Sequence, residues 1–260
     1  MPNFLDAITG TSTDPNQHKI YGVVVGKVTD NQDPQGLYRV KVKYPMQMNS
    51  GDESSYWARI CTFGAGKDRG MFNLPEVDDE VLIAFDKGEI MQPYIIGTVW
   101  NSDSTVHLEN KKDGAQKGKN NKRTYKSRSG HILEFSDDEE NKKEYIELKT
   151  KAGHYLILDD TDGALKCEIK DSKSENLLLL DTTNKKITLQ TDSGDMLIKA
   201  KNEIKIECKT LNVKSDDDTN FEAKNWNAKA SSNFVVEASS EGTVKSGSTL
   251  TVKGSQVNIN

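Results

Sequence analysis

The chain has 260 residues and a formal net charge of −5, with 34% hydrophobic and 29% charged residues. So few apolar residues exclude one compact domain built from the whole length, and favour partial disorder or an elongated or oligomeric form. The longest apolar runs span four or five residues, which is too short for a membrane-crossing helix.

Net charge is distributed unevenly along the chain. Residues 1–100 sum to −4 (9 basic, 13 acidic), residues 101–130 to +5 (8 basic, 3 acidic) and residues 131–260 to −6 (18 basic, 24 acidic). Because polyanion binding requires a basic groove, we expect no nucleic-acid partner. The three cysteines are widely separated, and the N-terminus lacks the features of a signal peptide, so we expect assembly in the cytoplasm with reduced thiols.

Residues 1–18 are polar and aperiodic, and we interpret them as an N-terminal arm. Residues 19–101 contain five strand-like segments between turn clusters: "YGVVVGKV", "YRVKVKYP", "YWARICTF", "EVLIAF" and "PYIIGTVW". In the second segment, alternation places apolar and aromatic side chains on one face: Tyr38, Val40, Val42 and Tyr44. Five such strands in about eighty residues predict a small antiparallel barrel.

Residues 102–129 are basic, rich in glycine and asparagine, and nearly free of apolar side chains, which indicates a linker or long loop. A nucleic-acid-binding patch is the alternative, but the interleaved aromatic residues that stack on bases are missing.

Residues 130–195 repeat at intervals of roughly twenty residues. "GHILEF", "GHYLIL", "ENLLLL" and "GDMLIK" are each followed by a polar turn or a second strand. The pattern predicts a run of hairpin-like β-units at the base of a longer structure.

A shorter repeat begins at residue 196. The middle apolar residue of each unit follows the previous one by seven or eight positions: Ile198, Ile206, Val213, Phe221, Ala228, Val236, Val244, Val252 and Ile259. A larger residue generally lies two positions earlier and a small one two positions later. Since alternate residues of a strand share a face, each triplet forms one inward row, and this regularity argues against a flexible tail.

A unit of this length is too short to enclose a core alone, because solenoid turns need roughly twenty residues. The rows must therefore meet equivalent rows of other chains, most simply three chains around a triangular prism. We predict an all-β protein in which residues 196–260 form an intertwined trimeric β-helix. The predicted trimer core is Met196, Ile198, Ile204, Ile206, Leu211, Val213, Phe221, Trp226, Phe234, Val236, Val244, Leu250 and Val252.

The five barrel segments, together with "GKDRGMFNLPEVDDEVLIAFDKGE", resemble the OB-fold domain of contractile-injection spike proteins. This family contains the phage baseplate assembly protein V and the type VI secretion spike proteins known as VgrG. The resemblance covers residues 20–101 and continues weakly through "SGHILEF". It implies a homotrimeric structural spike that sits on a baseplate hub and the first tube ring. On sheath contraction such a spike would puncture a target envelope, with effector cargo as a further partner.

The same resemblance implies a separate tip protein, a PAAR-like cone. Its predicted docking face consists of Leu250, Val252, Val257 and Ile259, since an apolar face with unpaired strand ends would otherwise promote aggregation. The sequence departs from some family members. It shows no lysozyme-like insertion, no His-x-His pair for an apical iron, and no large N-terminal hub domains, so we expect a separate hub protein.

We find no motif that predicts catalysis, a cofactor or a metal site. His131 and His154 recur at equivalent places in two repeats, which favours a structural role. "GAGKDRG" at 64–70 lacks the leading glycine and the Ser/Thr of a phosphate loop, and the acidic clusters at 136–141 and 215–218 lack calcium-loop spacing. Two alternative functions stay open at this point: an OB-fold that binds nucleic acid, and a trimeric adhesin or fibre tip.

Overall fold

The computed structural model describes residues 19–44, 55–106 and 119–259. The predicted N-terminal arm and the middle of the predicted linker, including His107, lie outside these residues. The chain divides into two units, Met1–Met196 and Leu197–Asn260. Within the described ranges, no helix combines the length and the apolar character needed to span a membrane.

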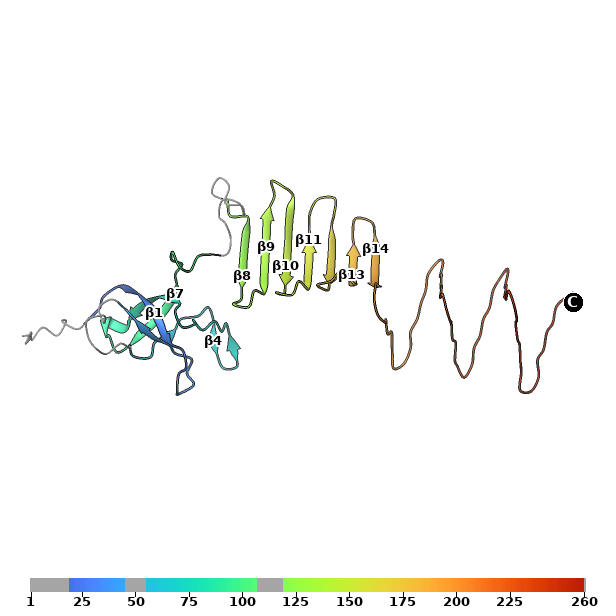
Figure 1. Cartoon of the computed structure of the whole chain (residues 1–260), viewed down its shortest axis with the longest axis horizontal. Coiled ribbons are helices and arrows are strands. Elements are labelled where there is room, and N and C mark those ends of the chain that lie inside the picture. Colours follow the sequence, from blue (N-terminus) through green and yellow to red (C-terminus); the bar gives the residue numbers. More distant parts are fainter. Residues whose placement is uncertain (1–18, 45–54, 107–118, 260) are drawn as a thin grey trace, which may run out of the picture. The chain divides into compact units, whose positions relative to one another are not determined.

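A five-stranded sheet forms the first part of unit one (Figure 1). Its strands follow the order β2-β1-β6-β7-β3 and have these bounds: β1 Val23–Asp30, β2 Lys41–Lys43, β3 Arg59–Ile60, β6 Glu80–Phe85 and β7 Pro93–Thr98. Neighbours are antiparallel except β3 and β7, which are parallel. A bridge between Val40 and Ala58 brings the two outer strands together and closes the sheet into an OB-type barrel.

Two short elements complete the barrel region. The hairpin of β4 (Ala65–Gly66) and β5 (Arg69–Gly70) occupies the "GAGKDRG" stretch, and the 3-10 turn η2 (Asp86–Gly88) joins β6 to β7. The stretch that superficially resembles a phosphate loop is therefore a tight hairpin.

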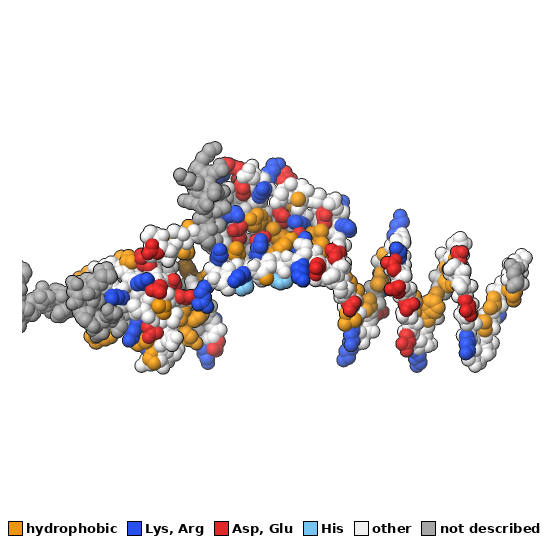
Figure 2. Space-filling model, in the orientation of Figure 1, with side chains coloured by type: hydrophobic (Ala, Val, Ile, Leu, Met, Phe, Trp, Pro, Cys, Tyr) orange, Lys and Arg blue, Asp and Glu red, His pale blue; other side chains and the backbone are white. Residues whose placement is uncertain are grey.

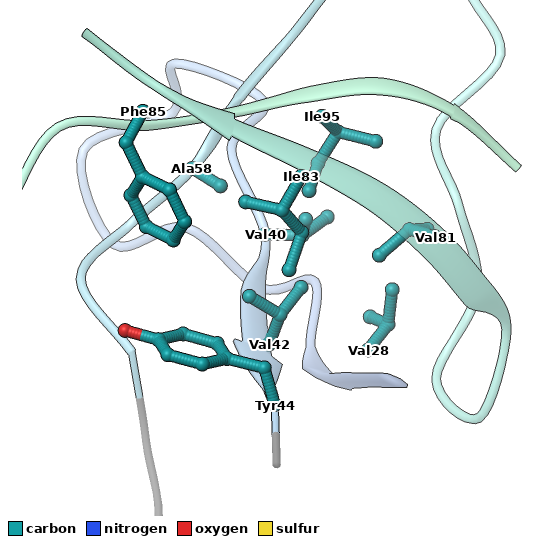
Figure 3. Close-up of a cluster of buried hydrophobic side chains, with 9 residues drawn as sticks. All are labelled: Val28, Val40, Val42, Tyr44, Ala58, Val81, Ile83, Phe85 and Ile95. Atoms are coloured by element: carbon teal, nitrogen blue, oxygen red, sulfur yellow. The ribbon is translucent and has the colours of Figure 1, made fainter. Parts of the chain in front are cut away.

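The barrel encloses one apolar core (Figure 3). Its buried members come from every strand or its flank: Val28, Val40, Val42, Tyr44, Ala58, Val81, Ile83, Phe85 and Ile95. The predicted alternation is confirmed at Val40, Val42 and Tyr44 and is wrong at Tyr38, which is 64% exposed. Tyr38 has φ = 55°, so the chain is not extended there, and its ring packs edge-on against Phe72 at 5.2 Å between centroids.

Gly26 permits the close approach of β1 to its neighbours. A Cβ atom at this position would lie 2.7 Å from Cδ1 of Ile83 and 2.9 Å from the carbonyl oxygen of Lys43. No side chain fits between these atoms, so the packing of β1 depends on a glycine in its middle.

A second, seven-stranded sheet forms the rest of unit one (Figure 1). It is an antiparallel meander in sequence order, with these bounds: β8 Lys122–Lys126, β9 Ile132–Asp138, β10 Lys143–Lys149, β11 Tyr155–Asp159, β12 Lys166–Lys170, β13 Asn176–Asp181 and β14 Lys186–Thr191. Strands β9–β14 lie within the segment of predicted hairpin units. Strand β8 lies within the predicted linker, where polar residues hid it from the sequence pattern; it pairs with β9 over five residues.

The repeated histidines stabilise turns of this sheet. The backbone N–H of Lys151 donates to Nδ1 of His131 at 3.3 Å, and that of Ser172 donates to Nδ1 of His154 at 3.1 Å. Each histidine follows a glycine with a positive φ, 96° at Gly130 and 99° at Gly153, a conformation that favours glycine. The recurring Gly-His pair is thus a turn motif.

Unit two is built differently. Between residues 197 and 259 the chain forms no strand and no backbone–backbone hydrogen bond of its own. It zigzags (Figure 1), with bends that begin at residues 201, 209, 216, 224, 231, 239, 247 and 255. Each bend begins three positions after a middle apolar residue of the repeat, so the backbone and the sequence share one period.

Candidate functional site

The β8–β14 sheet has one almost entirely apolar face. Register pairs such as Leu133 with Leu148, and Phe135 with Ile146, place apolar side chains opposite one another across all seven strands. The face consists of Tyr125, Leu133, Phe135, Ile146, Leu148, Leu156, Leu158, Cys167, Ile169, Leu178, Leu180, Ile187 and Leu189. Polar residues share this face only toward the strand ends: Arg123, Asp137, Glu144, Asn176 and Thr191. We call this surface the sheet face.

The sheet face is open in the single chain. Individual exposed fractions on it reach 73% at Ile187. The side of these strands that Figure 2 turns toward the viewer is mixed, with acidic and basic side chains among the apolar ones. A single-layer sheet must bury its apolar face against another element to be stable. This surface could not be predicted from the individual hairpins, because the continuous apolar face follows from the register of all seven strands.

The opposite face of the same sheet, which we call the polar face, combines paired charged groups with four apolar residues: Ile132, Ile157, Leu177 and Leu179. At its β8 end, the Glu134 carboxylate accepts hydrogen bonds from Nζ of Lys122 (2.9 Å), the hydroxyl of Thr124 (3.1 Å) and the hydroxyl of Tyr145 (2.8 Å). Burial raises the pKa of Glu134, but these donors outweigh burial, and its pKa is lowered overall. This cluster also explains why β8 joins the sheet despite its polar sequence.

A second cluster repeats the arrangement three strands further on, at Glu168 of β12. The Glu168 carboxylate accepts hydrogen bonds from Nζ of Lys166 (2.7 Å) and from the hydroxyl of Tyr155 (2.7 Å). Burial opposes the charged form of Glu168, yet these donors lower its pKa overall. Burial and the bond to Glu168 raise the pKa of Tyr155 to about 12. The charged groups of both clusters are thus paired within the sheet.

Unit two carries the predicted trimer-core residues, apart from Met196, which is the last residue of unit one. Every one of them is exposed in the single chain, from 46% at Met196 to 81% at Val236. The chain itself brings two of them together: the rings of Phe221 and Trp226 stack with centroids 6.2 Å apart and planes 9° apart. These residues belong to consecutive units, so neighbouring rows contact each other along the chain. We call the thirteen residues the needle rows.

The positions between the needle rows are polar except at Leu197 and Val235. Lys205 and Glu207, in one unit, form an exposed ion pair at 2.7 Å, and Lys214 pairs with Asp216 at 3.3 Å, at the bend that begins at residue 216. The predicted tip-docking residues are likewise open: Leu250, Val252, Val257 and Ile259 are all exposed.

The conformation of unit two requires a partner for physical reasons. Ordering a residue costs about 1–2 kcal/mol of backbone conformational entropy, and burial and hydrogen bonding must offset that cost. From Leu197 to Asn258, no residue in this unit is buried, and no backbone N–H donates to a backbone carbonyl within the chain. A regular, repetitive backbone with such a pattern is stable only when other chains supply the missing contacts.

Among the described residues, we find no cluster of three or more His, Cys, Asp or Glu side chains placed to hold a metal ion. The acidic clusters serve turns: Asp138 accepts from the amide N–H and side-chain amide of Asn141, and the Ser215 hydroxyl donates to the Asp218 carbonyl. Cys61, Cys167 and Cys208 are free thiols.

Comparison with known proteins identifies the barrel. Residues 24–100 match the family described as the type VI secretion system/phage-baseplate injector OB domain. The barrel is an injector-type OB domain. Its strand order and its closure by the Val40–Ala58 bridge agree with this assignment.

Three relatives show the extent of the similarity. The chain is 32% identical over 98 residues to the type VI secretion system spike protein VgrG1a of Pseudomonas aeruginosa, covering 37% of this chain and 15% of that protein. It is 34% identical over 70 residues to the spike protein VgrG3 of Vibrio cholerae, covering 26% and 7%, respectively. It is 32% identical over 69 residues to the actin cross-linking toxin VgrG1 of Vibrio cholerae, covering 26% and 6%.

This chain is therefore VgrG-like in its barrel, and its all-β architecture joins an OB domain to a β-rich extension. The matched segments cover at most 15% of these three relatives. Most of each relative thus lies outside the comparison. The similarity supports a structural spike role and leaves the sheet and unit two to be interpreted from their own geometry.

Proposed function

We propose that this chain is the subunit of a homotrimeric central spike in a contractile injection apparatus. One observation carries the proposal: an injector-type barrel belongs to the same chain as a long, regular series of apolar rows that have no partner within that chain. Three copies would bring each row onto a common axis and supply the missing backbone bonds from neighbouring strands.

In this assembly the sheet face is buried as well. Three sheets, each with one apolar and one polar side, form a closed prism when their apolar sides turn inward, and the polar clusters of Glu134 and Glu168 then face water. The barrels would contact a separate hub protein and the first tube ring. The spike would be assembled in the cytoplasm and driven outward through a target envelope on sheath contraction, with any effector cargo attached to it.

The end of the rows is proposed as the seat of a PAAR-like tip protein. Leu250, Val252, Val257 and Ile259 offer exposed apolar side chains at alternate positions, the arrangement that a small apolar cone would cover. Replacing Val257 and Ile259 together by aspartate should abolish co-purification of such a tip protein, whereas Asn258→Asp, between them, should not. Retention of the tip by the double variant would contradict this seat.

Native mass spectrometry of the full chain tests the central proposal. We expect a species of three times the chain mass that resists dilution, together with a three-fold particle in electron micrographs. A monomer stable at micromolar concentration would refute the trimer. A trimeric adhesin or fibre tip would share the apolar rows, but it would not account for the injector-type barrel.

A further inference from the structure

The barrel carries a groove that is independent of the sheet face and the needle rows. It has a volume of about 860 Å³ and lies between the chain before β2, strand β3, the β4–β5 hairpin with the segment after it, and the start of β7. Three arginines, four aromatic residues and two methionines line it, and its lining contains neither aspartate nor glutamate. A groove of this kind is unusual on a chain whose net charge is −5.

One arginine forms a fixed wall of the groove. Arg39 donates from Nε to Oδ2 of Asp33 (2.8 Å) and from Nη2 to Oδ1 of the same residue (2.9 Å), and its guanidinium lies 5.8 Å from the ring centre of Trp57. The bond from Arg39 holds the pKa of Asp33 well below its usual range. Asp33 therefore neutralises Arg39 and holds it against Trp57, and this pair shapes the groove without adding free charge.

The other two arginines have no acidic partner among the described residues. Arg59 lies over the ring of Tyr94, with its Cζ 5.5 Å from the ring centre and Nη1 3.4 Å from the hydroxyl oxygen. Arg69 folds across Gly66, where a Cβ would meet its Nε at 2.9 Å. Both guanidinium groups are thus oriented by their neighbours while their charges stay uncompensated, and such groups favour bidentate pairing with carboxylates.

Apolar surface adjoins these charges. Phe72 is 68% exposed and contacts Tyr38 edge-on, while Met71 and Met91 are also exposed at the groove. Exposed aromatic and methionine side chains beside arginine are the composition of protein–protein contact sites. The groove therefore offers both an anionic and an apolar subsite.

We propose that this groove binds an extended peptide segment of a partner protein in which acidic side chains lie next to apolar ones. Two uncompensated arginines match one or two carboxylates. A single-stranded nucleic acid is a poorer match, because its repeated phosphates require a longer basic track, whereas residues 1–100, which include the barrel, have a net charge of −4. The barrel would thereby recruit a protein partner at a site that does not depend on the trimer axis.

An unbiased peptide array tests the inference with the full chain. The purified protein is applied to immobilised randomised nonapeptides, and we expect Asp and Glu to be enriched among the bound sequences. The variant Arg59→Gln/Arg69→Gln should lose this enrichment. The variant Arg123→Gln, on β8 outside the barrel, should keep it. Absence of acidic enrichment, or equal enrichment by the double variant, would overturn the proposal.

Fluorescence anisotropy then gives the size of the effect. The best array peptide should bind at least about tenfold more tightly than its Glu→Gln counterpart, a difference equivalent to losing one charge-assisted contact. The double variant should show the same loss, with an unchanged circular dichroism spectrum to exclude misfolding. An octathymidylate probe that binds more tightly than the peptide would instead assign the groove to nucleic acid. Because these assays need no particular oligomeric state, their failure would leave the trimer proposal unaffected.

Discussion

The barrel and unit two solve the problem of stability in opposite ways. The barrel buries nine apolar residues within a single chain and closes its own sheet through the Val40–Ala58 bridge. In unit two all the needle rows are exposed, and no backbone–backbone hydrogen bond forms between residues 197 and 259. The same chain thus contains one part that can fold alone and one part whose structure depends on assembly.

The β8–β14 sheet is intermediate between these two. Its backbone bonds are satisfied within the chain, and its polar face is closed by the Glu134 and Glu168 clusters, but its sheet face is open. In the proposed trimer, dependence on the other copies would therefore increase along the chain, from the barrel core to the sheet face to the backbone of unit two. The predictions below test this gradient.

The largest effect should come from a charge placed in a needle row. Val236→Asp puts three carboxylates on the proposed axis, and burying an unpaired charge is strongly unfavourable, so we expect loss of the trimer in sedimentation experiments. Val235→Asp is the matched control, since this neighbour is similarly exposed in the single chain but points to the other face of an extended segment. Hydrogen exchange of residues 197–259 should become unprotected only in the first variant. Equal behaviour of the two variants would contradict the needle rows.

A cavity in the barrel core should have a large but local effect. Ile95→Ala removes a buried side chain and should lower the free energy of barrel unfolding by about 2–5 kcal/mol, whereas the exposed neighbour Ile96→Ala should change it by less than about 1 kcal/mol. Denaturant unfolding and amide exchange of the barrel measure this difference. The trimer should persist in both variants; its loss in Ile95→Ala would show that barrel and needle do not fold independently.

Gly26→Ala tests the close approach of β1 to its neighbours by adding a methyl group instead of removing a side chain. The added methyl group would meet Ile83 and the Lys43 carbonyl at distances that require both strands to shift. We expect a loss of about 1–3 kcal/mol in barrel stability, measured as above. Gly97→Ala, where the added atom would meet no neighbour within 4 Å, is the control. An unchanged Gly26→Ala barrel would mean that the strands adjust freely.

The smallest effect should be a change in pH dependence of the sheet. The lowered pKa of Glu168 contributes stability above its ordinary value of 4.5, and this contribution is lost as pH falls through the lower folded-state value. Glu168→Gln should cost about 1 kcal/mol at neutral pH and flatten the acid side of the stability profile. Glu140→Gln, an exposed change in the turn between β9 and β10, should leave the profile unchanged. On the alkaline side, the raised pKa of Tyr155 contributes stability below pH 10.0 that is lost as pH rises through about 12.

The sequence predicted what depends on local alternation. Val40, Val42 and Tyr44 are buried as expected, and the bends of unit two follow the period of the apolar residues. The predicted burial is wrong at Tyr38, because the left-handed backbone conformation of this residue ends the alternation. Such a conformation has no clear sequence signal in a tyrosine. Strand β8 was not predicted either, because it joins the sheet through Lys122 and Thr124 bonds to Glu134 rather than through apolar residues.

The groove on the barrel could not be predicted from the sequence, for a related reason. Arg59 and Arg69 are ten positions apart, and no local pattern shows that they lie in one acid-free lining or that Asp33 neutralises Arg39 but not them. Net charge over residues 1–100 concealed a local positive surface. Averages over a domain are therefore a poor guide to the charge of one site on it.

The shared period of bends and apolar residues has a consequence for how such a chain can change in evolution. Insertion or deletion of one whole unit of seven or eight residues keeps every later side chain in its original row, because each unit contains its own bend three positions after the middle apolar residue. A single-residue insertion within an extended segment would move the later side chains of that segment to the opposite face. Unit two can therefore lengthen or shorten by duplication or loss of repeats, so that its reach is adjustable without a redesign of its contacts.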